Sequence, residues 1–368
     1  MTRRGFLISA AASAACGRKR GAGFPGYAFV ANEEGQAVAV VDLTAFAVAR
    51  HIRLEASPTR VISHPLHEAV YALTPRNGTV HEIRLDTLTA GRRARLPGPA
   101  LDLRFGPAAN VLWALCADSR QLVRLPLDNF RPDARIALPA VPAEFEISPD
   151  GAWAVVSLPD RRIAALVNLA QRRVERQIPT GAQSGFLRFR DDSRLLLAAN
   201  PADRVLSAFE IPSGRLLTHL PLAVSPKHCC FKGDGGQLFL TGDGMDAVVT
   251  VYTYRTEVGA TTLAGRAPGY VAASTAPDYL FVANPASGDV TILNIQTQRV
   301  MAAVAVGREP GHITITPDNQ YALVLNRVSG DMAVIRLASV IANRARSAPL
   351  FTMIPVGSRP VSAVVRAV

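Results

Sequence analysis

The sequence predicts an all-β protein in which eight blades, each of four antiparallel strands, close into a ring. Short apolar runs alternate with polar residues and are bounded by Gly, Pro, Asn and Asp, as in the stretch 280–321. That alternation is typical of short antiparallel strands. The pattern recurs every forty-two residues without a gap, and the last residues, 361–368, align with the first strand of the other repeats.

The repeat fixes the number of blades. From Asn284 the forty-two-residue step runs back through Gly242, Asn200, Leu158, Cys116, Thr74 and Asn32, and forward to Asn326. A four-stranded unit cannot bury both of its own faces, so copies must pack against one another, and a fixed period of this size indicates a β-propeller. The alternative is seven blades plus a degenerate unit.

The N-terminal residues 1–16 are predicted to be an export signal. The motif TRRGFL, with Arg3 and Arg4, resembles the twin-arginine signal, and the apolar run after it is too short to span a bilayer. The segment SAAC, ending at Cys16, resembles a lipoprotein processing box, which implies a lipid on Cys16. The alternative is cleavage after Ala14 and release of a soluble protein.

Residues 17–25 are expected to form a flexible basic tether, and residues 26–368 a single propeller domain. Tyr27–Asn32, Ala37–Leu43 and Ala47–Leu54 give the first blade only three strands. Val361–Val368 should supply its innermost strand and close the ring, which leaves no free sheet edge around the circle. An insertion of eight residues within 338–350 interrupts the last blade and has room for a short helix.

The repeat carries a recognisable motif. FVAN followed by a Gly-containing turn, a strand such as Val38–Asp42, and a G-x-x-P segment resembles the YVTN-type propeller repeat over residues 26–368. This resemblance implies the fold and implies little about activity.

Composition narrows the function classes. The formal charge is +11, but five of the basic residues lie in the first twenty, and the rest form no clustered basic face. We therefore expect no nucleic-acid partner, and a monomer. The motifs of common hydrolases, zinc proteases, P-loop proteins and dinucleotide-binding enzymes are absent from the sequence, so no catalytic residue is predicted.

Two further sets of residues, three cysteines and a pair of histidines, have side chains that could form chemical sites. Cys116, Cys229 and Cys230 do not form a pattern typical of disulfides, and we expect buried free thiols. His64 and His67 follow the first strand of the second blade and are interpreted as solvent-facing rather than as a metal pair.

One residue before each innermost strand forms the candidate ligand-binding site. The forty-two-residue step selects Arg60, Asp102, Glu144, Phe186, His228, Tyr270 and His312, and Ser362 after the insertion. In a propeller these positions surround one mouth of the central channel. We predict a ligand-binding site made by Arg60, Asp102, Glu144, His228, Tyr270 and His312, which could hold a planar or anionic ligand, haem or a metal. The alternative is a polar mouth that is only structural, with Asp102 and Glu144 neutralising Arg60.

Four functions remain compatible with the sequence. The first is an exported binding module, tethered to the membrane by a lipid, whose partner is an envelope protein or a cell-wall component. The second is a haem-type cofactor protein, because eight-bladed propellers of this kind resemble the haem-binding domain of dissimilatory nitrite reductases and its biosynthetic relatives. The third is a lactonase-like hydrolase. The fourth, a quinone-cofactor dehydrogenase, is disfavoured because only Trp113 and Trp153 are present.

Overall fold

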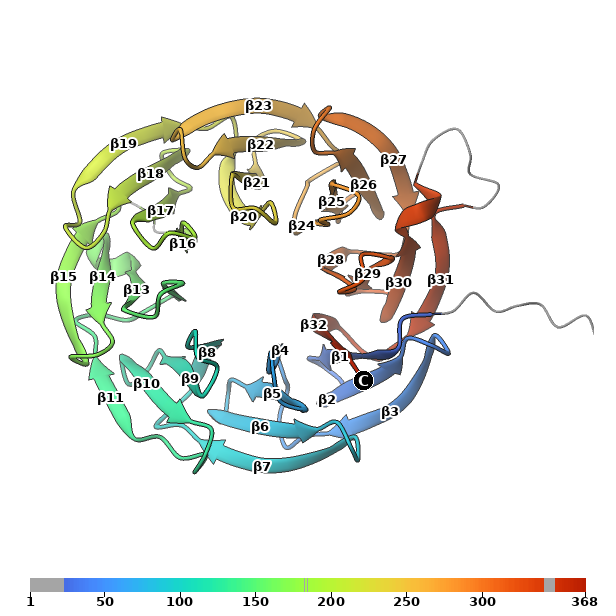
Figure 1. Cartoon of the computed structure of the whole chain (residues 1–368), viewed down its shortest axis with the longest axis horizontal. Coiled ribbons are helices and arrows are strands. Elements are labelled where there is room, and N and C mark those ends of the chain that lie inside the picture. The colour runs from blue at the N-terminus through green and yellow to red at the C-terminus, as the bar shows by residue number, and fades with distance from the viewer. Residues whose placement is uncertain (1–22, 182, 184, 341–347) are drawn as a thin grey trace, which may run out of the picture.

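A ring of eight four-stranded antiparallel sheets surrounds a central axis, as the computed structural model shows (Figure 1). The structure describes residues 23–181, 183, 185–340 and 348–368. In each sheet the strands run in order from the axis to the rim. The eight-bladed, all-β prediction is confirmed, and the seven-bladed alternative is wrong.

The first four blades, each from the innermost to the outermost strand, contain the following strands. They are β32 (Pro360–Ala367), β1 (Gly26–Asn32), β2 (Ala37–Asp42) and β3 (Ala47–Arg53); β4 (Arg60–Ser63), β5 (Ala69–Thr74), β6 (Thr79–Arg84) and β7 (Thr89–Arg95); β8 (Ala100–Phe105), β9 (Val111–Cys116), β10 (Gln121–Pro126) and β11 (Ala134–Ala137); and β12 (Glu144–Ile147), β13 (Trp153–Leu158), β14 (Ile163–Asn168) and β15 (Arg173–Pro179).

The other four blades follow the same order. They are β16 (Leu187–Phe189), β17 (Leu195–Asn200), β18 (Val205–Glu210) and β19 (Leu216–Pro221); β20 (Ser225–Phe231), β21 (Gln237–Asp243), β22 (Ala247–Tyr252) and β23 (Glu257–Leu263); β24 (Val271–Ala273), β25 (Tyr279–Asn284), β26 (Asp289–Asn294) and β27 (Arg299–Ala305); and β28 (Pro310–Ile315), β29 (Tyr321–Asn326), β30 (Asp331–Arg336) and β31 (Leu350–Pro355). Two short 3-10 turns complete the described elements, η1 (Pro159–Arg161) and η2 (Leu337–Ser339).

The C-terminal strand closes the ring. Strand β32 pairs with β1 in antiparallel register from Gly26–Ala367 to Asn32–Pro360, with one bulge. The two strands lie side by side at the axis end of the first blade (Figure 1). The sequence-based prediction for residues 361–368 is therefore confirmed, with the strand beginning one residue earlier.

The hydrophobic core lies between adjacent blades rather than in one central mass. For example, β9 and β13 from neighbouring blades contribute Trp113, Leu115 and Val156 to one buried cluster. The second strands of several blades, such as β5, β17 and β29, are buried at every residue. The outermost strands face solvent at most positions, as in β3. Each blade therefore depends on both neighbours for burial of its two faces.

Asparagine ends the second strand in four repeats, and the structure explains this part of the motif: Asn32, Asn200, Asn284 and Asn326. These side chains are buried. Asn326 Nδ2 donates to Asp331 Oδ1 (2.6 Å) across the turn. A Cβ added at Gly307 would lie 2.6 Å from this same Nδ2, and one added at Gly357 would lie 2.8 Å from Asn32 Nδ2. The repeated Asn and Gly therefore pack together where the chain crosses between blades.

Several expectations concern residues outside the described part of the chain. Arg3, Arg4 and Cys16 lie there, as do most of the tether and residues 341–347 of the insertion. The described start of the insertion contains only the single turn η2. Within the described ranges, no helix is long and apolar enough to cross a bilayer.

Candidate functional site

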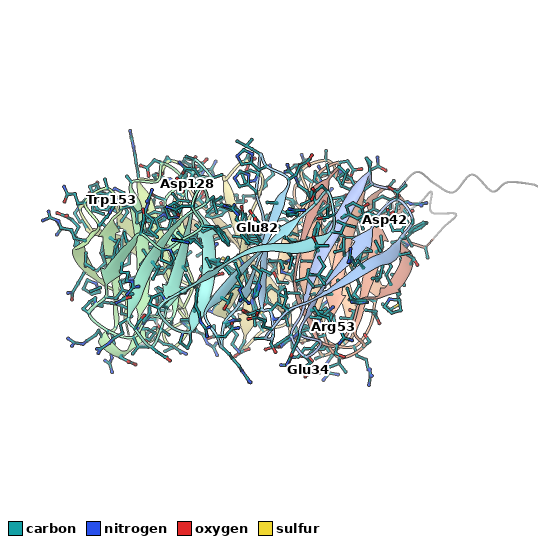
Figure 2. The ribbon with its side chains drawn as sticks, turned by 90° about the horizontal axis from the view of Figure 1, so that it is seen from below. Glu34, Asp42, Arg53, Glu82, Asp128 and Trp153 are labelled. Carbon is teal, nitrogen blue, oxygen red and sulfur yellow. The ribbon has the colours of Figure 1, made fainter. Side chains whose placement is uncertain are left out.

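The ring positions selected by the repeat lie near one face of the disc. Arg60 starts β4 and pairs with Leu73, next to the end of β5. The first strand of a blade therefore begins beside the turn that joins its second and third strands. The corresponding turn of the first blade contains Glu34, which lies at one face of the disc, whereas Asp128 lies at the opposite face (Figure 2). We refer to the former as the Glu34 face.

On one side of the ring, alternating charges make a continuous network, here called the charged arc. Its ion pairs, in order, are Arg60–Asp102 (3.2 Å), Asp102–Arg104 (3.4 Å), Arg104–Glu146 (3.3 Å), Glu146–Arg188 (3.3 Å) and Arg188–Glu144 (2.6 Å). The side chains come from β4, β8, β12 and β16, in consecutive blades. Three arginines face three carboxylates, so the arc neutralises its own charge.

The electrostatics of the arc follow from its burial. Desolvation raises the pKa of Glu144 and outweighs the attraction of Arg188, which acts in the opposite direction. Desolvation alone would lower the pKa of Arg188, but negative charge on Cys229, Glu144 and Glu146 raises it. Arg60 is already paired with Asp102. The pair with Asp102 is the one that the structural alternative named, whereas Glu144 pairs with Arg188 rather than with Arg60.

Sequence reasoning missed the second layer of the charged arc. Arg104, Glu146 and Arg188 lie two residues after the selected positions, on the same side of the innermost strands. Side chains two residues apart share one side of a strand. Repeating the forty-two-residue step at that offset would have found all three.

The facing part of the ring is aromatic, and we call His228, Tyr270 and His312 the aromatic arc. The rings of His228 and Tyr270 lie 4.3 Å apart between centroids at 34°, and those of Tyr270 and His312 lie 6.2 Å apart at 63°. Tyr270 is 41% exposed. The sequence therefore predicted correctly that these three residues would adjoin one another.

Both imidazoles of the aromatic arc favour the neutral form. Burial lowers the pKa of His312 to about 4, even though a hydrogen bond to Ala363 favours the charged form. Burial and the nearby Lys227 also lower the pKa of His228. His312 Nε2 lies 3.0 Å from the carbonyl oxygen of Ala363. A neutral imidazole in this position donates from Nε2 and keeps its lone pair on Nδ1.

The remaining two ring positions do not contribute polar groups to the mouth. Phe186 is buried between blades. Ser362 is also buried, and its Oγ accepts a hydrogen bond from the backbone N–H of Val61 (3.3 Å), which joins β32 to the next blade.

The residues described contain no group of three or more His, Cys, Asp or Glu side chains arranged to hold a metal ion. His228 and His312 are separated by Tyr270, which lies against both. This geometry does not favour a bare metal ion shared by the two histidines.

Of the two histidines His64 and His67, which were both predicted to face solvent, only one does. His64 is buried at 2% exposure, whereas His67 is exposed. His64 Nδ1 accepts the backbone N–H groups of Leu66 and His67 (3.0 and 2.7 Å), while Nε2 lies 2.8 Å from Ala109 O. The prediction that His64 faces solvent was wrong because this imidazole satisfies the backbone of its own turn.

The cysteines are free thiols in the described chain, as expected. Cys116 is buried, whereas Cys229 and Cys230 are half-buried on β20. Desolvation raises the pKa of the Cys116 and Cys229 thiols to about 11. These thiols are therefore protonated near neutral pH and are weak nucleophiles.

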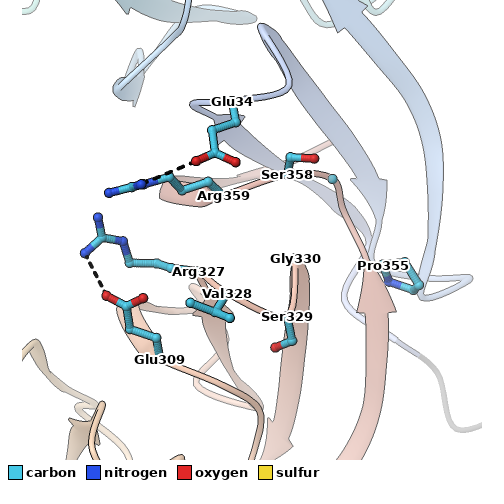
Figure 3. A pocket seen from close by; sticks show the side chains of 10 residues that line it. Glu34, Glu309, Arg327, Val328, Ser329, Gly330, Pro355, Ser358 and Arg359 are labelled. Carbon is cyan, nitrogen blue, oxygen red and sulfur yellow. Dashed lines mark hydrogen bonds and ion pairs between the residues drawn. The ribbon is translucent and has the colours of Figure 1, made fainter.

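A cavity of about 490 Å³ opens at the Glu34 face, and Glu34 is one of its lining residues (Figure 3). Its wall includes Glu309, three residues before His312, together with the turn 327–330 and the loop 357–359. A second cavity, of about 350 Å³, lies on the other side of Arg359. Neither cavity could be predicted from the strand period, because turns and loops form most of their walls.

Comparison with known proteins supports the architecture. No protein-family model matches the chain, and no curated protein matches it. Among solved structures, the dihydro-heme d1 dehydrogenase NirN in complex with DHE aligns with a TM-score of 0.78 and 15% identity, over 92% of this chain and 75% of that one.

Two other solved structures are similar over most of their length. Hydrazine synthase from Kuenenia stuttgartiensis aligns with a TM-score of 0.59 and 16% identity, over 72% of this chain and 91% of that chain. A functionally unknown protein from Desulfotomaculum acetoxidans aligns with a TM-score of 0.63 and 12% identity, over 81% and 99%. At these identities the likeness shows the β-propeller fold alone.

Proposed function

We propose that this chain is an exported, lipid-tethered propeller of the YVTN repeat kind that acts as a binding module at the cell envelope. Its small-molecule site is the aromatic arc at the channel mouth. The ligand class that fits best is a planar tetrapyrrole of the haem type.

The aromatic arc carries this proposal. His228, Tyr270 and His312 adjoin at centroid distances of 4.3 and 6.2 Å. Contiguous aromatic rings offer a large, rigid surface to a planar ligand, and an aromatic pair contributes about 0.5–1.5 kcal/mol beyond simple burial. The charged arc opposite neutralises itself and provides a polar boundary. Convergent polar groups at a concave site are a common mark of ligand binding.

The donor chemistry of the arc suits an iron tetrapyrrole better than a bare metal ion. The macrocycle supplies most of the iron ligands, so the protein needs to add only one or two. A neutral imidazole can fill such a position. His228 is the candidate ligand, because its lowered pKa keeps it neutral and no hydrogen bond engages its ring among the described residues. Tyr270 would stack on the macrocycle, while the contact with Ala363 orients His312.

A solved structure of similar architecture lends support. The similar NirN structure is named as a dihydro-heme d1 dehydrogenase in complex with DHE. Its β-propeller fold accompanies binding of a haem-related molecule. We do not extend its dehydrogenase activity to this chain, for which binding alone is proposed.

Absorption spectroscopy tests the proposal. Protein purified from its native host should show a Soret band, and the ligand-free protein should bind added haemin with a spectral shift. His228→Ala should abolish that shift while leaving the melting temperature close to that of the native chain. His51→Ala, on the exposed outer strand β3, is the matched control. A colourless native protein that gives no shift with haemin would overturn the tetrapyrrole assignment.

A further inference from the structure

The cavity at the Glu34 face lies between the last blade and the first. It holds about 490 Å³ and is lined mainly by the turn after β29 and the loop before β32. Two arginines project into it from these segments, Arg327 and Arg359 (Figure 3). None of the aromatic-arc residues lines this cavity.

The two side chains extend in the same direction and their guanidinium groups lie next to each other, each with a carboxylate on its outer side (Figure 3). Arg359 contacts Glu33 through Nε (2.9 Å) and Glu34 through Nη1 (3.4 Å). Arg327 contacts Glu309 through Nη1 at 3.5 Å. The glutamates therefore engage some, but not all, of the N–H donors of the two guanidiniums.

Arg327 has unused hydrogen-bonding capacity. Its Nε is shielded from solvent and has no acceptor among the described residues. Its one ion pair, at 3.5 Å, is longer than the 2.7–2.9 Å typical of a charge-assisted hydrogen bond. A guanidinium has five N–H donors, and a buried donor without a partner is costly.

A row of arginines extends past this cavity. The adjoining cavity, of about 350 Å³, is lined by Arg359 on one side and by Arg76, Ser57 and Thr59 on the other. Arg76 comes from the turn after β5, and within the described ranges it makes no ion pair. Arg327, Arg359 and Arg76 thus belong to the last, first and second blades.

We infer that these two cavities form a binding site for a small organic anion with at least two carboxylate groups. One carboxylate lies beside Arg327 and Arg359, where it accepts hydrogen bonds from the N–H donors that the glutamates do not engage. Another reaches Arg76 through the adjoining cavity, within range of the Ser57 and Thr59 hydroxyls. The combined volume suits an organic acid better than a single inorganic ion. This inference is independent of the tetrapyrrole proposal.

Calorimetric titration with citrate, glutarate, acetate and inorganic phosphate at 0.15 M salt tests the inference. Citrate or glutarate should bind the native chain at least tenfold more tightly than acetate or phosphate. Arg327→Gln and Arg359→Gln should each weaken citrate binding at least tenfold. Arg76→Gln should reduce the advantage of citrate over acetate.

Arg161→Gln is the matched control, because Arg161 is an exposed arginine in the equivalent turn of the fourth blade. It should bind citrate as the native chain does. Should a Gln variant lose its cooperative melting transition, Arg327→Lys, which keeps the charge and removes the fork of donors, takes its place and should still bind several-fold more weakly. Citrate binding that is no tighter than acetate binding, or is unchanged in the arginine variants, overturns the inference.

The tetrapyrrole proposal and the anion-site proposal can be contradicted independently of each other. Arg327→Gln should leave haemin binding unchanged, and His228→Ala should leave citrate binding unchanged. A loss of citrate binding in His228→Ala, with a normal melting temperature, would contradict a separate anion site.

Discussion

The imidazole of His228 lies against the phenol ring of Tyr270, with centroids 4.3 Å apart and planes inclined at 34°. The two residues are separated by one full repeat in the sequence and lie in adjacent blades. The equivalent positions of neighbouring repeats therefore come into direct contact at the channel mouth, and what each blade places there determines the chemistry of the site.

Tyr270 is expected to contribute to ligand binding mainly through its ring. Tyr270→Ala should weaken haemin binding about three- to tenfold, which corresponds to the 0.5–1.5 kcal/mol of an aromatic pair. Tyr270→Phe should bind nearly as well as the native chain. Spectroscopic titration measures both. Equal weakening in the two variants would instead indicate that the hydroxyl is the important group.

His312 should make the stability of the ring depend on pH. Its folded pKa of about 4 lies below the ordinary histidine value of 6.5. The unfolded chain therefore binds more protons between these values, so the free energy of unfolding contributed by His312 is present above about pH 6.5 and falls as the pH falls toward 4. At about 1.4 kcal/mol for each pKa unit, the loss is at most roughly 3.5 kcal/mol.

The comparison for His312 is His312→Gln, whose amide can still donate to Ala363 O but does not titrate. Urea unfolding at pH 7, 6, 5 and 4 should show a smaller loss of stability in the variant than in the native chain. Parallel pH profiles for the two proteins would contradict the assignment to His312.

Arg104 should be a sensitive member of the charged arc, because it pairs with both Asp102 and Glu146. Arg104→Gln leaves each of these partly buried carboxylates with one arginine, Arg60 or Arg188, and we expect a loss of about 1–2 kcal/mol in the free energy of unfolding. Arg84→Gln removes an exposed pair with Asp86 and should cost no more than about 0.5 kcal/mol. Similar losses of unfolding free energy in the two variants would mean that an ion pair in the charged arc contributes no more to stability than an exposed pair.

The C-terminal strand should be required for a stable ring. Deleting residues 361–368 removes most of the strand that pairs with β1 and exposes the apolar side chains of the first blade. Burial of each aliphatic side chain contributes about 1.5–3 kcal/mol, so the deletion should cost several kcal/mol. Deleting Val368 alone, which is 81% exposed, is the control. An unchanged melting temperature in the longer deletion would refute closure by this strand.

Export and tethering remain predictions from the sequence. Replacing Arg3 and Arg4 with Lys should leave the protein in the cytoplasm, and Cys16→Ala should release it from the membrane fraction. Cell fractionation with immunoblotting measures both. Native protein found free in the periplasm would favour cleavage after Ala14 over lipid attachment.

The sequence predicted the fold almost completely, because the forty-two-residue period determines how many blades there are and where their strands lie. Each strand of the ring repeats the same spacing, so a single alignment placed Tyr27–Asn32 and residues 361–368 in one blade. The same period predicted that His228, Tyr270 and His312 adjoin. Arg104 and Arg188 follow from the same period, because side chains two residues apart lie on the same side of a strand.

Features that depend on turns could not be predicted in the same way. The burial of His64 follows from hydrogen bonds to the N–H groups of Leu66 and His67, which no periodicity contains. The neighbouring guanidiniums of Arg327 and Arg359 come from two different turns in adjoining blades. Their proximity depends on side-chain conformation and on how closely those turns approach, neither of which a sequence period determines.

The junction between the last blade and the first has the same Asn–Gly contact as the junction at Asn326. Asn32 Nδ2 donates to Val356 O (2.7 Å), and Gly357 packs against this amide as Gly307 packs against Asn326. The backbone N–H of Val368 donates to Pro25 O (3.2 Å), so the described chain begins and ends at the same place. Where the ring opens is thus arbitrary: a circular permutant that links residue 368 to residue 25 and starts at the exposed Asp118 would keep every blade intact.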